Sequence, residues 1–234
     1  MKTPILHDSA EMADCSLVAF ACLAQTCPGR FWQAYRRHIW MNPMIPNADN
    51  PTNHNRLVAE PPKFSRVWAM PNRDTFSIPP IGDFVKRYLT QSTISIDPFA
   101  RNKQWATFTN DLNPETSAKY HMDAEVFLEM LHSLGVQADL LIFDPPYSPR
   151  QISECYKQIG REVGMKETQS ALLYQRVRNV AIPLLAPGAI VLSFGWNSVG
   201  MGIKHGFEQV EILLCCHGGA HNDTICLAER KISS

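Results

Sequence analysis

Four short segments between residues 90 and 200 are rich in apolar or β-branched side chains. They are residues 93–96, 105–109, 138–143 and 189–194. The third is apolar apart from Asp139, and a turn-forming Pro187-Gly188 pair precedes the fourth. Runs of this length with such boundaries are typical of strands that a parallel sheet buries on both faces. We therefore predict a strand at each of the four segments.

Helical periodicity separates these predicted strands. Residues 123–134 place apolar side chains at spacings of three and four, as one face of a helix requires. Further helix candidates are residues 81–89, 151–163 and 168–185. Near the C-terminus, residues 210–216 and 224–229 flank a glycine-rich turn and predict an antiparallel hairpin. The alternation predicts an α/β protein with a mostly parallel, twisted sheet that the hairpin closes.

The N-terminal third has a different pattern. Residues 9–26 and 31–40 have the composition of helices, whereas residues 41–80 are rich in Pro and Asn and show no periodicity. This irregular stretch interleaves basic and aromatic residues, such as Arg66 and Trp68. We expect an N-terminal helical and irregular extension, residues 1–80, that contacts a polyanion, followed by a catalytic domain, residues 81–234.

The composition of the 234-residue chain is that of a globular protein, with 45% hydrophobic residues and 22 basic against 22 acidic side chains. No apolar run approaches the roughly 18 residues that cross a bilayer. The start of the chain lacks the basic flank and cleavage site of a signal peptide. We therefore expect a soluble cytoplasmic protein with no membrane partner.

Seven cysteines at irregular spacing fit that compartment, and we interpret them as buried reduced thiols. Two groups combine cysteine with histidine: Cys15, Cys22, Cys27 and His38, and Cys215, Cys216, His217 and His221. Neither group has paired C-x-x-C spacing, so we expect no metal site.

Charge is unevenly distributed along the chain. Residues 30–90 hold nine basic and four acidic side chains, residues 91–147 hold three and eight, and residues 148–189 hold six and three. One interpretation is ordinary solvated surface. The other is an acidic pocket for a cationic cofactor, flanked by surfaces that meet a polyanion. Charge alone leaves both open.

Three aspartates, Asp97, Asp111 and Asp144, follow predicted strands. Ligands of doubly wound sheets bind beyond the carboxyl ends of the strands, so we expect a site there. The third aspartate begins the sequence Asp144-Pro145-Pro146-Tyr147. Its two prolines lack N–H donors, so this turn offers a carboxylate, rigid carbonyl acceptors and an aromatic face. Such a group suits a planar base with an exocyclic amino group.

This D-P-P-Y motif resembles that of S-adenosylmethionine-dependent DNA N6-adenine methyltransferases of the phage and prophage type. Ile96-Asp97-Pro98-Phe99 resembles their cofactor motif, and segments 109–114, 121–124 and 144–152 are also similar. The resemblance covers roughly residues 64–230. It implies a Rossmann-like class I methyltransferase fold and S-adenosylmethionine as the cofactor.

The resemblance also implies roles for single residues. Asp97 and Phe99 would line the methionine end of the cofactor, Asp111 would bind the ribose hydroxyls, and Asp123 would bind the adenine amino group. The implied cofactor-binding set is Asp97, Pro98, Phe99, Arg101, Asn110, Asp111, Asp123 and Asp144. The implied catalytic set is Asp144, Pro145, Pro146 and Tyr147. The Asp144 carboxylate and the Pro145 carbonyl would accept hydrogen bonds from the target amino group, and Tyr147 would stack on the flipped base.

The sequence differs from the family motif at two positions, and several of these residues also have a purely structural interpretation. Arg101 and Lys103 replace the two glycines that usually follow Phe99, and we expect Arg101 close to a cofactor carboxylate. Asp97 is also interpretable as a strand-end cap, Asp123 as a helix N-cap and the D-P-P-Y motif as a rigid turn. Trp196 fits either the wall of a base pocket or the protein core.

The expected partner is DNA, or RNA. We expect the chain to be a monomer or a homodimer in a bacterial or phage-infected cell. The expected nucleic-acid contacts are Arg150, Lys157, Arg161, Arg176, Arg178 and Trp196. About 46 residues separate Asp97 from Asp144, too few for a separate target-recognition domain. We therefore expect short or relaxed sequence specificity. The alternatives are transfer to RNA adenine or to N4 of cytosine, and a binding subunit without catalysis.

Overall fold

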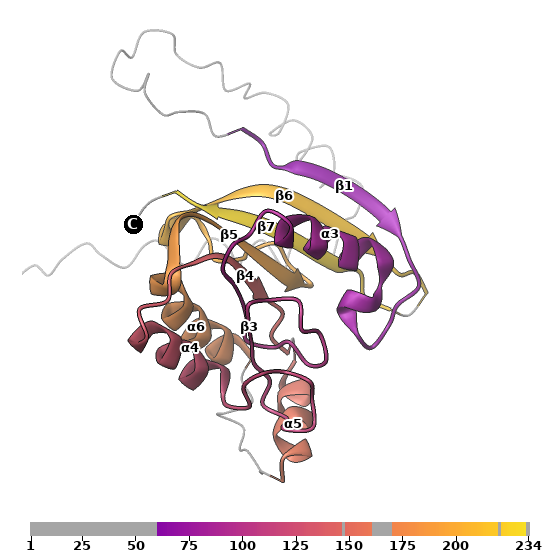
Figure 1. Ribbon diagram of the computed structural model, residues 1–234. Coiled ribbons are helices and arrows are strands. Elements are labelled where there is room, and N and C mark those ends of the chain that lie inside the picture. The colour runs from indigo at the N-terminus through magenta and orange to yellow at the C-terminus, as the bar shows by residue number, and fades with distance from the viewer. Residues whose placement is uncertain (1–59, 147, 161–169, 220, 233–234) are drawn as a thin grey trace, which may run out of the picture. The chain divides into compact units, whose positions relative to one another are not determined.

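The computed structural model describes residues 60–146, 148–160, 170–219 and 221–232. In this part of the chain seven strands form one sheet in the order β1-β6-β7-β5-β4-β2-β3 (Figure 1). The strands are β1 (Lys63–Trp68), β2 (Ser95–Asp97), β3 (Phe108–Thr109), β4 (Ala138–Phe143), β5 (Leu185–Gly195), β6 (Phe207–Cys216) and β7 (Thr224–Lys231). All neighbours pair in parallel except those of β7, which is antiparallel to β5 and β6. This arrangement is the class I methyltransferase, Rossmann-like fold.

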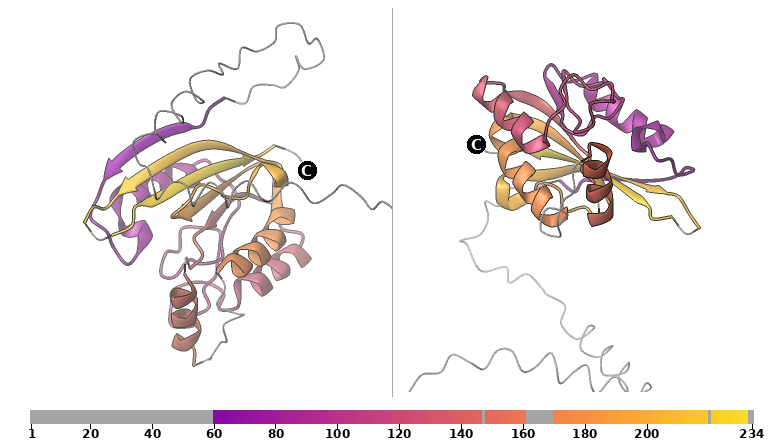
Figure 2. Two further views of the ribbon diagram at one scale, coloured as in Figure 1. Left: turned by 180° about the vertical axis from the view of Figure 1, so that it is seen from behind. Right: turned by 90° about the horizontal axis from the view of Figure 1, so that it is seen from below.

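Helices cover the two faces of the sheet (Figures 1 and 2). The α-helices are α3 (Pro79–Leu89), α4 (Ala124–Ser133), α5 (Pro149–Gln158) and α6 (Ser170–Ala181), and the short 3₁₀ helices are η1 (Thr75–Ser77), η2 (Ile182–Leu184) and η3 (Ile203–His205). On one face, Phe127 of α4 and Val177 of α6 belong to a fully buried cluster with Phe143 of β4. On the other face, Phe84 of α3 packs in a second cluster with Ile142 of β4. Because Ile142 and Phe143 pack in opposite clusters, β4 is buried on both faces, which explains why all its residues except Asp139 are apolar.

Most predicted elements are confirmed. The strand at 138–143 has the predicted bounds, α3 and α4 lie at the predicted helices, and β6 and β7 form the predicted antiparallel hairpin. Two strand predictions need correction. Only Phe108–Thr109 of segment 105–109 is a strand, and β5 begins at Leu185, so that Pro187-Gly188 lies inside it. The pairing of β5 with β4 shifts register there, which accommodates the proline.

The prediction of an irregular segment is wrong for residues 63–68, which form β1. The strand pairs in parallel with β6 at one edge of the sheet, so residues 60–80 contribute β1 and η1 to the same sheet and core as the rest. The pattern concealed the strand because its larger side chains, Phe64 and Trp68, are the exposed ones. The expected helices at 9–26 and 31–40 lie outside the described residues.

No helix among the described residues is long and apolar enough to cross a membrane. Cys155, Cys215, Cys216 and Cys226 are free thiols, and the last three are buried. Within the described ranges no three His, Cys, Asp or Glu side chains are grouped so that they would hold a metal ion.

Candidate active site

Three carboxylates meet at the carboxyl edge of the sheet. Asp97 is the last residue of β2, Asp144 follows the last residue of β4, and Asp111 lies two residues beyond β3. Because β2 pairs in parallel with both β3 and β4, the three strands end at the same edge. The sequence predicted this arrangement, and the structure brings the three residues together.

Asp97 is the most deeply buried of the three, with 1% of its surface exposed. Its Oδ1 accepts a hydrogen bond from the Phe99 N–H at 3.0 Å. Burial raises the pKa of this carboxyl well above its usual range, and the nearby charges of Asp144 and Asp111 raise it further. The three carboxyl groups are therefore close enough for their charges to interact, and the burial of Asp97 disfavours its charged form.

The loop after β2 is fixed by Asn110, which is fully buried. Its amide nitrogen donates to the carbonyls of Pro98 at 3.1 Å and Met122 at 3.0 Å, and its Oδ1 accepts from the Met122 N–H at 3.1 Å. Asn110 was expected to bind the cofactor. The structure shows its side-chain amide bonded to backbone, which joins three segments of the site, and its role in cofactor binding stays a prediction.

Arg101 and Lys103, which replace the two expected glycines, fasten this loop to the segment before α3. Arg101 has a φ of 50°, the left-handed conformation that glycine adopts without strain. Its Nη1 donates to the Arg73 carbonyl at 2.9 Å, and its N–H donates to Asp111 Oδ2 at 3.1 Å. Lys103 Nζ lies 3.1 Å from Asp74 Oδ2. At both positions where a glycine was expected, a basic side chain thus links the loop after β2 to residues 73–74.

A cavity of about 700 Å³ opens at this edge. It is lined by Arg73, Thr75, Phe99, Arg101, Asn102, Asp111, Asn113, Glu115, Thr116, Asp144, Pro145, Pro146, Gln151, Glu154, Cys155 and Gln158. Its volume lies within the range of about 300–1,000 Å³ that is usual for small-molecule sites. The beginning of the D-P-P-Y motif and the predicted cofactor residues Phe99, Arg101 and Asp111 therefore share one cavity.

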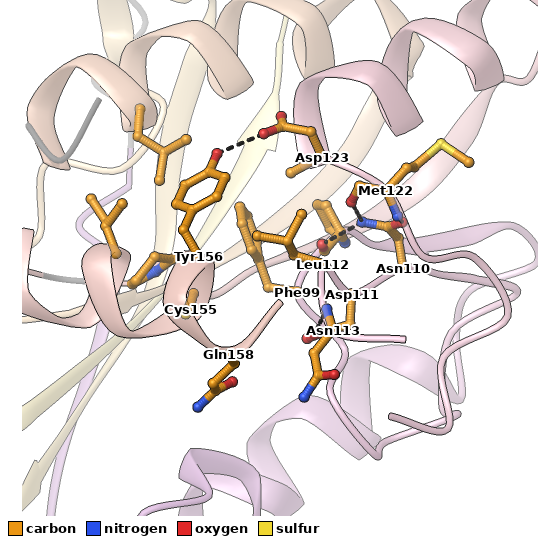
Figure 3. A pocket seen from close by; sticks show the side chains of 15 residues that line it. Phe99, Asn110, Asp111, Leu112, Asn113, Met122, Asp123, Cys155, Tyr156 and Gln158 are labelled. Atoms are coloured by element: carbon orange, nitrogen blue, oxygen red, sulfur yellow. Dashed lines mark hydrogen bonds between the residues drawn. The ribbon is translucent and has the colours of Figure 1, made fainter. Parts of the chain in front are cut away.

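A smaller cavity of about 70 Å³ adjoins the first and shares Phe99, Asp111 and Pro146 with it (Figure 3). Its wall also includes Leu112, Met122, Asp123 and Tyr156. Asp123 caps α4, because its Oδ1 accepts from the Glu125 N–H at 3.0 Å. Its Oδ2 accepts from the Tyr156 hydroxyl at 2.7 Å. The N-cap interpretation of Asp123 is thus confirmed, and the same carboxylate also faces a cavity.

The turn after β4 leads directly into α5. Pro145 is buried, and Asp144 and Pro146 are half-buried. Ser148 caps α5 by accepting from the Gln151 N–H at 3.3 Å, and Pro149 occupies the first turn, where its missing donor is harmless. Tyr147 lies outside the described residues. The helix supplies Cys155 and Tyr156 to the site, which the sequence analysis did not single out; burial raises the pKa of the Cys155 thiol.

The predicted nucleic-acid contacts are dispersed. Arg150 pairs with Glu154 at 2.8 Å within α5, and Arg176 of α6 pairs with Glu125 of α4 at 3.5 Å. Arg178 is half-buried, with its guanidinium carbon 6.0 Å from the centre of the Tyr174 ring. Lys157 is exposed, as is Trp196 after β5, and Arg161 lies outside the described residues. Of the described members, Trp196 directly follows a strand at the edge that carries the carboxylates.

No protein-family model and no curated protein matches the sequence. Among solved structures, the chain is similar to TrmN from Thermus thermophilus, with 15% identity over 66% of this chain and 49% of that one and a TM-score of 0.43. It is also similar to the N-methyltransferase NodS from Bradyrhizobium japonicum WM9 in complex with S-adenosyl-L-homocysteine, with 10% identity over 64% of this chain and 88% of NodS and a TM-score of 0.39.

A third similar structure is the putative methyltransferase YhhF from Escherichia coli, with 12% identity over 66% of this chain and 86% of that one and a TM-score of 0.40. The chain spans about half the length of TrmN. At 10–15% identity these three likenesses concern the fold alone. The strand order, with β7 inserted antiparallel between β5 and β6, defines that class I methyltransferase fold independently.

Proposed function

We propose that this protein transfers a methyl group from S-adenosylmethionine to the N6 amino group of adenine in DNA. The observation that carries the proposal is the position of Asp144-Pro145-Pro146. These residues leave β4 at the carboxyl edge and line the same cavity as Phe99, Arg101 and Asp111. An acceptor-rich turn beside an acidic, ligand-sized cavity is the arrangement that an amino-group methyltransferase needs.

The residues present fit the cofactor. Asp111 and Asp123 offer carboxylates to an adenosine, and Phe99, Leu112 and Met122 offer an apolar wall. Asp97 and Asp144 supply negative charge where a cationic methionine end would lie, and the basic Arg101 side chain would meet its carboxylate. When bound, S-adenosylmethionine supplies an electrophilic methyl group on a positively charged sulfur.

The chain's own contribution to the reaction is positioning. The Asp144 carboxylate and the Pro145 carbonyl would accept both hydrogens of the target amino group and so direct its nitrogen lone pair into the cavity. Proximity and orientation of this kind can lower a barrier by about 7–11 kcal/mol. The same acceptors would stabilise the positive charge that develops on the nitrogen. Tyr147, by its place in the motif, is expected to stack on the flipped base.

Short or relaxed specificity remains part of the proposal. Between Asp97 and Asp144 the chain builds β3, α4 and β4 and the loops that line the cavities. No separate recognition domain lies in that interval. Base-edge contacts would therefore come from few residues, and fewer base contacts mean less sequence discrimination.

The test is to incubate the purified full chain with unmethylated DNA and methyl-labelled S-adenosylmethionine and to separate the nucleosides after digestion. Label in N6-methyladenine supports the proposal. Label in N4-methylcytosine, or transfer to RNA alone, would contradict the assigned substrate. Cofactor binding without transfer to any nucleic acid would instead indicate a binding subunit.

A further inference from the structure

The described wall of the large cavity carries two basic side chains, Arg73 and Arg101. Arg101 follows β2, whereas Arg73 lies between β1 and η1. Because Arg101 Nη1 donates to the Arg73 carbonyl at 2.9 Å, one guanidinium helps to hold the backbone that presents the other. Arg73 is exposed, and its guanidinium has no hydrogen-bond or ion-pair partner among the described residues. It is therefore a cation at the cavity that no described carboxylate meets.

The charge of the neighbouring Asp74 is met by a different cation. Its Oδ2 accepts from the Ser77 hydroxyl at 2.6 Å and lies 3.1 Å from Lys103 Nζ. The Asp74 N–H donates to Asn72 Oδ1 at 3.0 Å, and its carbonyl accepts from the Ser77 N–H at 3.0 Å. The backbone on both sides of Arg73 is thus fixed, so a ligand that binds there has to order little more than a side chain.

Thr75 lines the same cavity two residues after Arg73. Its hydroxyl also has no hydrogen-bond partner among the described residues. A guanidinium presents several N–H donors in a planar fork that suits the oxygens of a phosphate, and a hydroxyl adds one more donor. The two side chains together therefore offer an anion a set of donors that the protein does not use.

The remaining charged groups of the wall are acidic. They are Asp111, Glu115, Asp144 and Glu154, and only the last is paired with a basic side chain, Arg150, at 2.8 Å. A phosphodiester that approached this cavity would be repelled by the carboxylates. An unmatched cation at the cavity offsets that repulsion, since opposite charges at short range attract.

The proposed mechanism brings such a phosphodiester to the cavity. In that mechanism the target amino group is bound by Asp144 and Pro145. The N6 amino group and the glycosidic nitrogen lie at opposite ends of adenine, so a flipped base that enters with its amino group first leaves its sugar and phosphates toward solvent. Arg73, exposed and yet part of the cavity wall, lies on that outer side.

We propose that Arg73, with Thr75, binds a phosphate next to the flipped target adenine; this inference rests on the proposed function. Arg73 would be a positioning residue, because it would hold the backbone of the target nucleotide while Asp144 holds the base. A phosphate contact carries no sequence information, which agrees with short or relaxed specificity. The cofactor carboxylate is the other anion with the chemistry to bind this guanidinium, and the experiment separates the two.

The experiment measures the affinity of the full chain, with saturating S-adenosylhomocysteine, for a fluorescent duplex in which the wild type methylates one identified adenine. Three further duplexes each carry a single neutral methylphosphonate: 5′ of that adenine, 3′ of it, or at the far end of the duplex. The variants are Arg73→Ala, Arg73→Lys and, as the matched control, Arg230→Ala. Arg230 is also exposed, but it pairs with Glu208 at 3.4 Å and lies level with Leu140, before the end of β4.

Arg73→Ala should weaken binding of the unmodified duplex by about 5- to 50-fold and lower the salt dependence by about one counterion. One of the two flanking methylphosphonates should weaken the wild type by a similar factor and leave Arg73→Ala unchanged, because charge and cation form one pair. Arg73→Lys should keep the salt dependence and part of the affinity. Arg230→Ala should match the wild type. Equal losses for the wild type and Arg73→Ala at both flanking positions would overturn the inference.

Calorimetry without DNA tests the cofactor carboxylate. S-adenosylhomocysteine carries this group and 5′-methylthioadenosine lacks it, so a phosphate contact predicts that Arg73→Ala binds both as the wild type does. A loss confined to S-adenosylhomocysteine, without coupling to either flanking phosphate, would assign Arg73 to the cofactor and overturn the inference. So would a lowered melting temperature of Arg73→Ala with unchanged DNA affinity, since the guanidinium would then have a partner within the protein.

The two proposals fail in different ways. If the wild type makes N6-methyladenine in DNA and Arg73→Ala shows no coupling to a flanking phosphate, the contact is wrong and the proposed function stands. If the wild type neither binds nor methylates DNA, both are wrong. A loss of affinity in Arg73→Ala that one flanking methylphosphonate reproduces in the wild type supports the contact.

Discussion

The Tyr156 hydroxyl donates a hydrogen bond to Asp123 Oδ2 at 2.7 Å, across the smaller of the two cavities (Figure 3). The other oxygen of this carboxylate is occupied by the Glu125 N–H. Asp123 is the residue that the resemblance assigns to the adenine amino group of the cofactor. Its cavity, at about 70 Å³, is far smaller than the usual ligand site. A cofactor that used Asp123 would therefore compete with the Tyr156 hydroxyl for Oδ2.

Tyr156→Phe should consequently strengthen cofactor binding. The variant removes a hydrogen bond to a charged group, typically about 1.5–3 kcal/mol, that competes with the adenine for Asp123. Because the vacated carboxylate regains some solvation, we expect a gain of about 2- to 10-fold in affinity. Isothermal titration calorimetry with S-adenosylhomocysteine measures it. Asp123→Ala is the paired variant and should weaken binding; a parallel weakening by Tyr156→Phe would make Tyr156 part of the binding site.

Asp144→Asn should lower methyl transfer by at least about 100-fold and weaken cofactor binding much less. The amide keeps one acceptor oxygen but loses the other and the negative charge, which would stabilise the positive charge that develops on the target nitrogen. Label incorporation into DNA gives the rate, and calorimetry gives the cofactor affinity. Asp83→Asn, at an exposed position of α3, is the control for loss of an acidic side chain. Normal turnover of Asp144→Asn would remove Asp144 from the mechanism.

Asn110→Ala tests the scaffold of the site. The substitution leaves the Met122 N–H and two backbone carbonyls without their partner in a fully buried place. An unsatisfied buried polar group costs about 1–3 kcal/mol, so we expect a clear loss of thermal stability. At about 2–4 °C per kcal/mol, calorimetry or circular dichroism would resolve it. An unchanged melting temperature together with lost cofactor affinity would instead show that Asn110 acts in cofactor binding and not as a scaffold.

The sequence predicted well which carboxylates meet at the carboxyl edge of the sheet, because strand ends are marked locally. Asp97 and Asp144 each end an apolar run, and the parallel order of an α/β sheet then places them together. Tyr156 could not be predicted in the same way, since its partner Asp123 lies 33 residues away and the contact depends on how α5 packs. Trp68 was concealed for another reason. An edge strand whose aromatic residues face outward lacks the alternation that reveals a strand.

The predicted nucleic-acid contacts show that the net charge of a sequence segment does not tell where its side chains lie in the fold. Arg176 and Arg178 belong to a stretch with net positive charge, yet both lie in the second half of α6. That helix leads to the start of β5 and hence toward the amino edge of the sheet, away from the carboxylates. Arg176 is paired with Glu125 in the first turn of α4, next to Asp123, so its charge is already met by an acidic side chain. Position in the fold, not charge along the chain, decides which cations can meet a substrate.

The substitutions Asp97→Asn and Asp139→Asn should change the stability of the fold in opposite directions at neutral pH. Burial raises the pKa of Asp97 in the folded state. The protonated side chain therefore stabilises the fold fully below about pH 4, the usual pKa of an aspartate in an unfolded chain. This stability is lost as the pH rises through the folded-state pKa. For Asp139, burial acts to raise the pKa, but hydrogen bonds from the Ser92 hydroxyl and from the Thr93 and Ile94 N–H groups outweigh it and lower the pKa. Asp139 therefore stabilises the fold above about pH 4 and ceases to do so as the pH falls through its folded pKa.

Thermal unfolding at pH 4 and pH 7 separates the two cases. Asp97→Asn keeps an oxygen for the Phe99 N–H, so it should raise the melting temperature at pH 7 relative to the wild type and have little effect at pH 4. Asp139→Asn should lower the melting temperature at pH 7 and cost less at pH 4. A change of equal size and sign at both pH values for Asp97→Asn would show that its charge is not what destabilises the fold. With the expected signs, the Asp97 carboxyl lowers the stability of the protein at neutral pH. A residue that costs stability at the carboxyl edge of the sheet is what a role in ligand binding predicts.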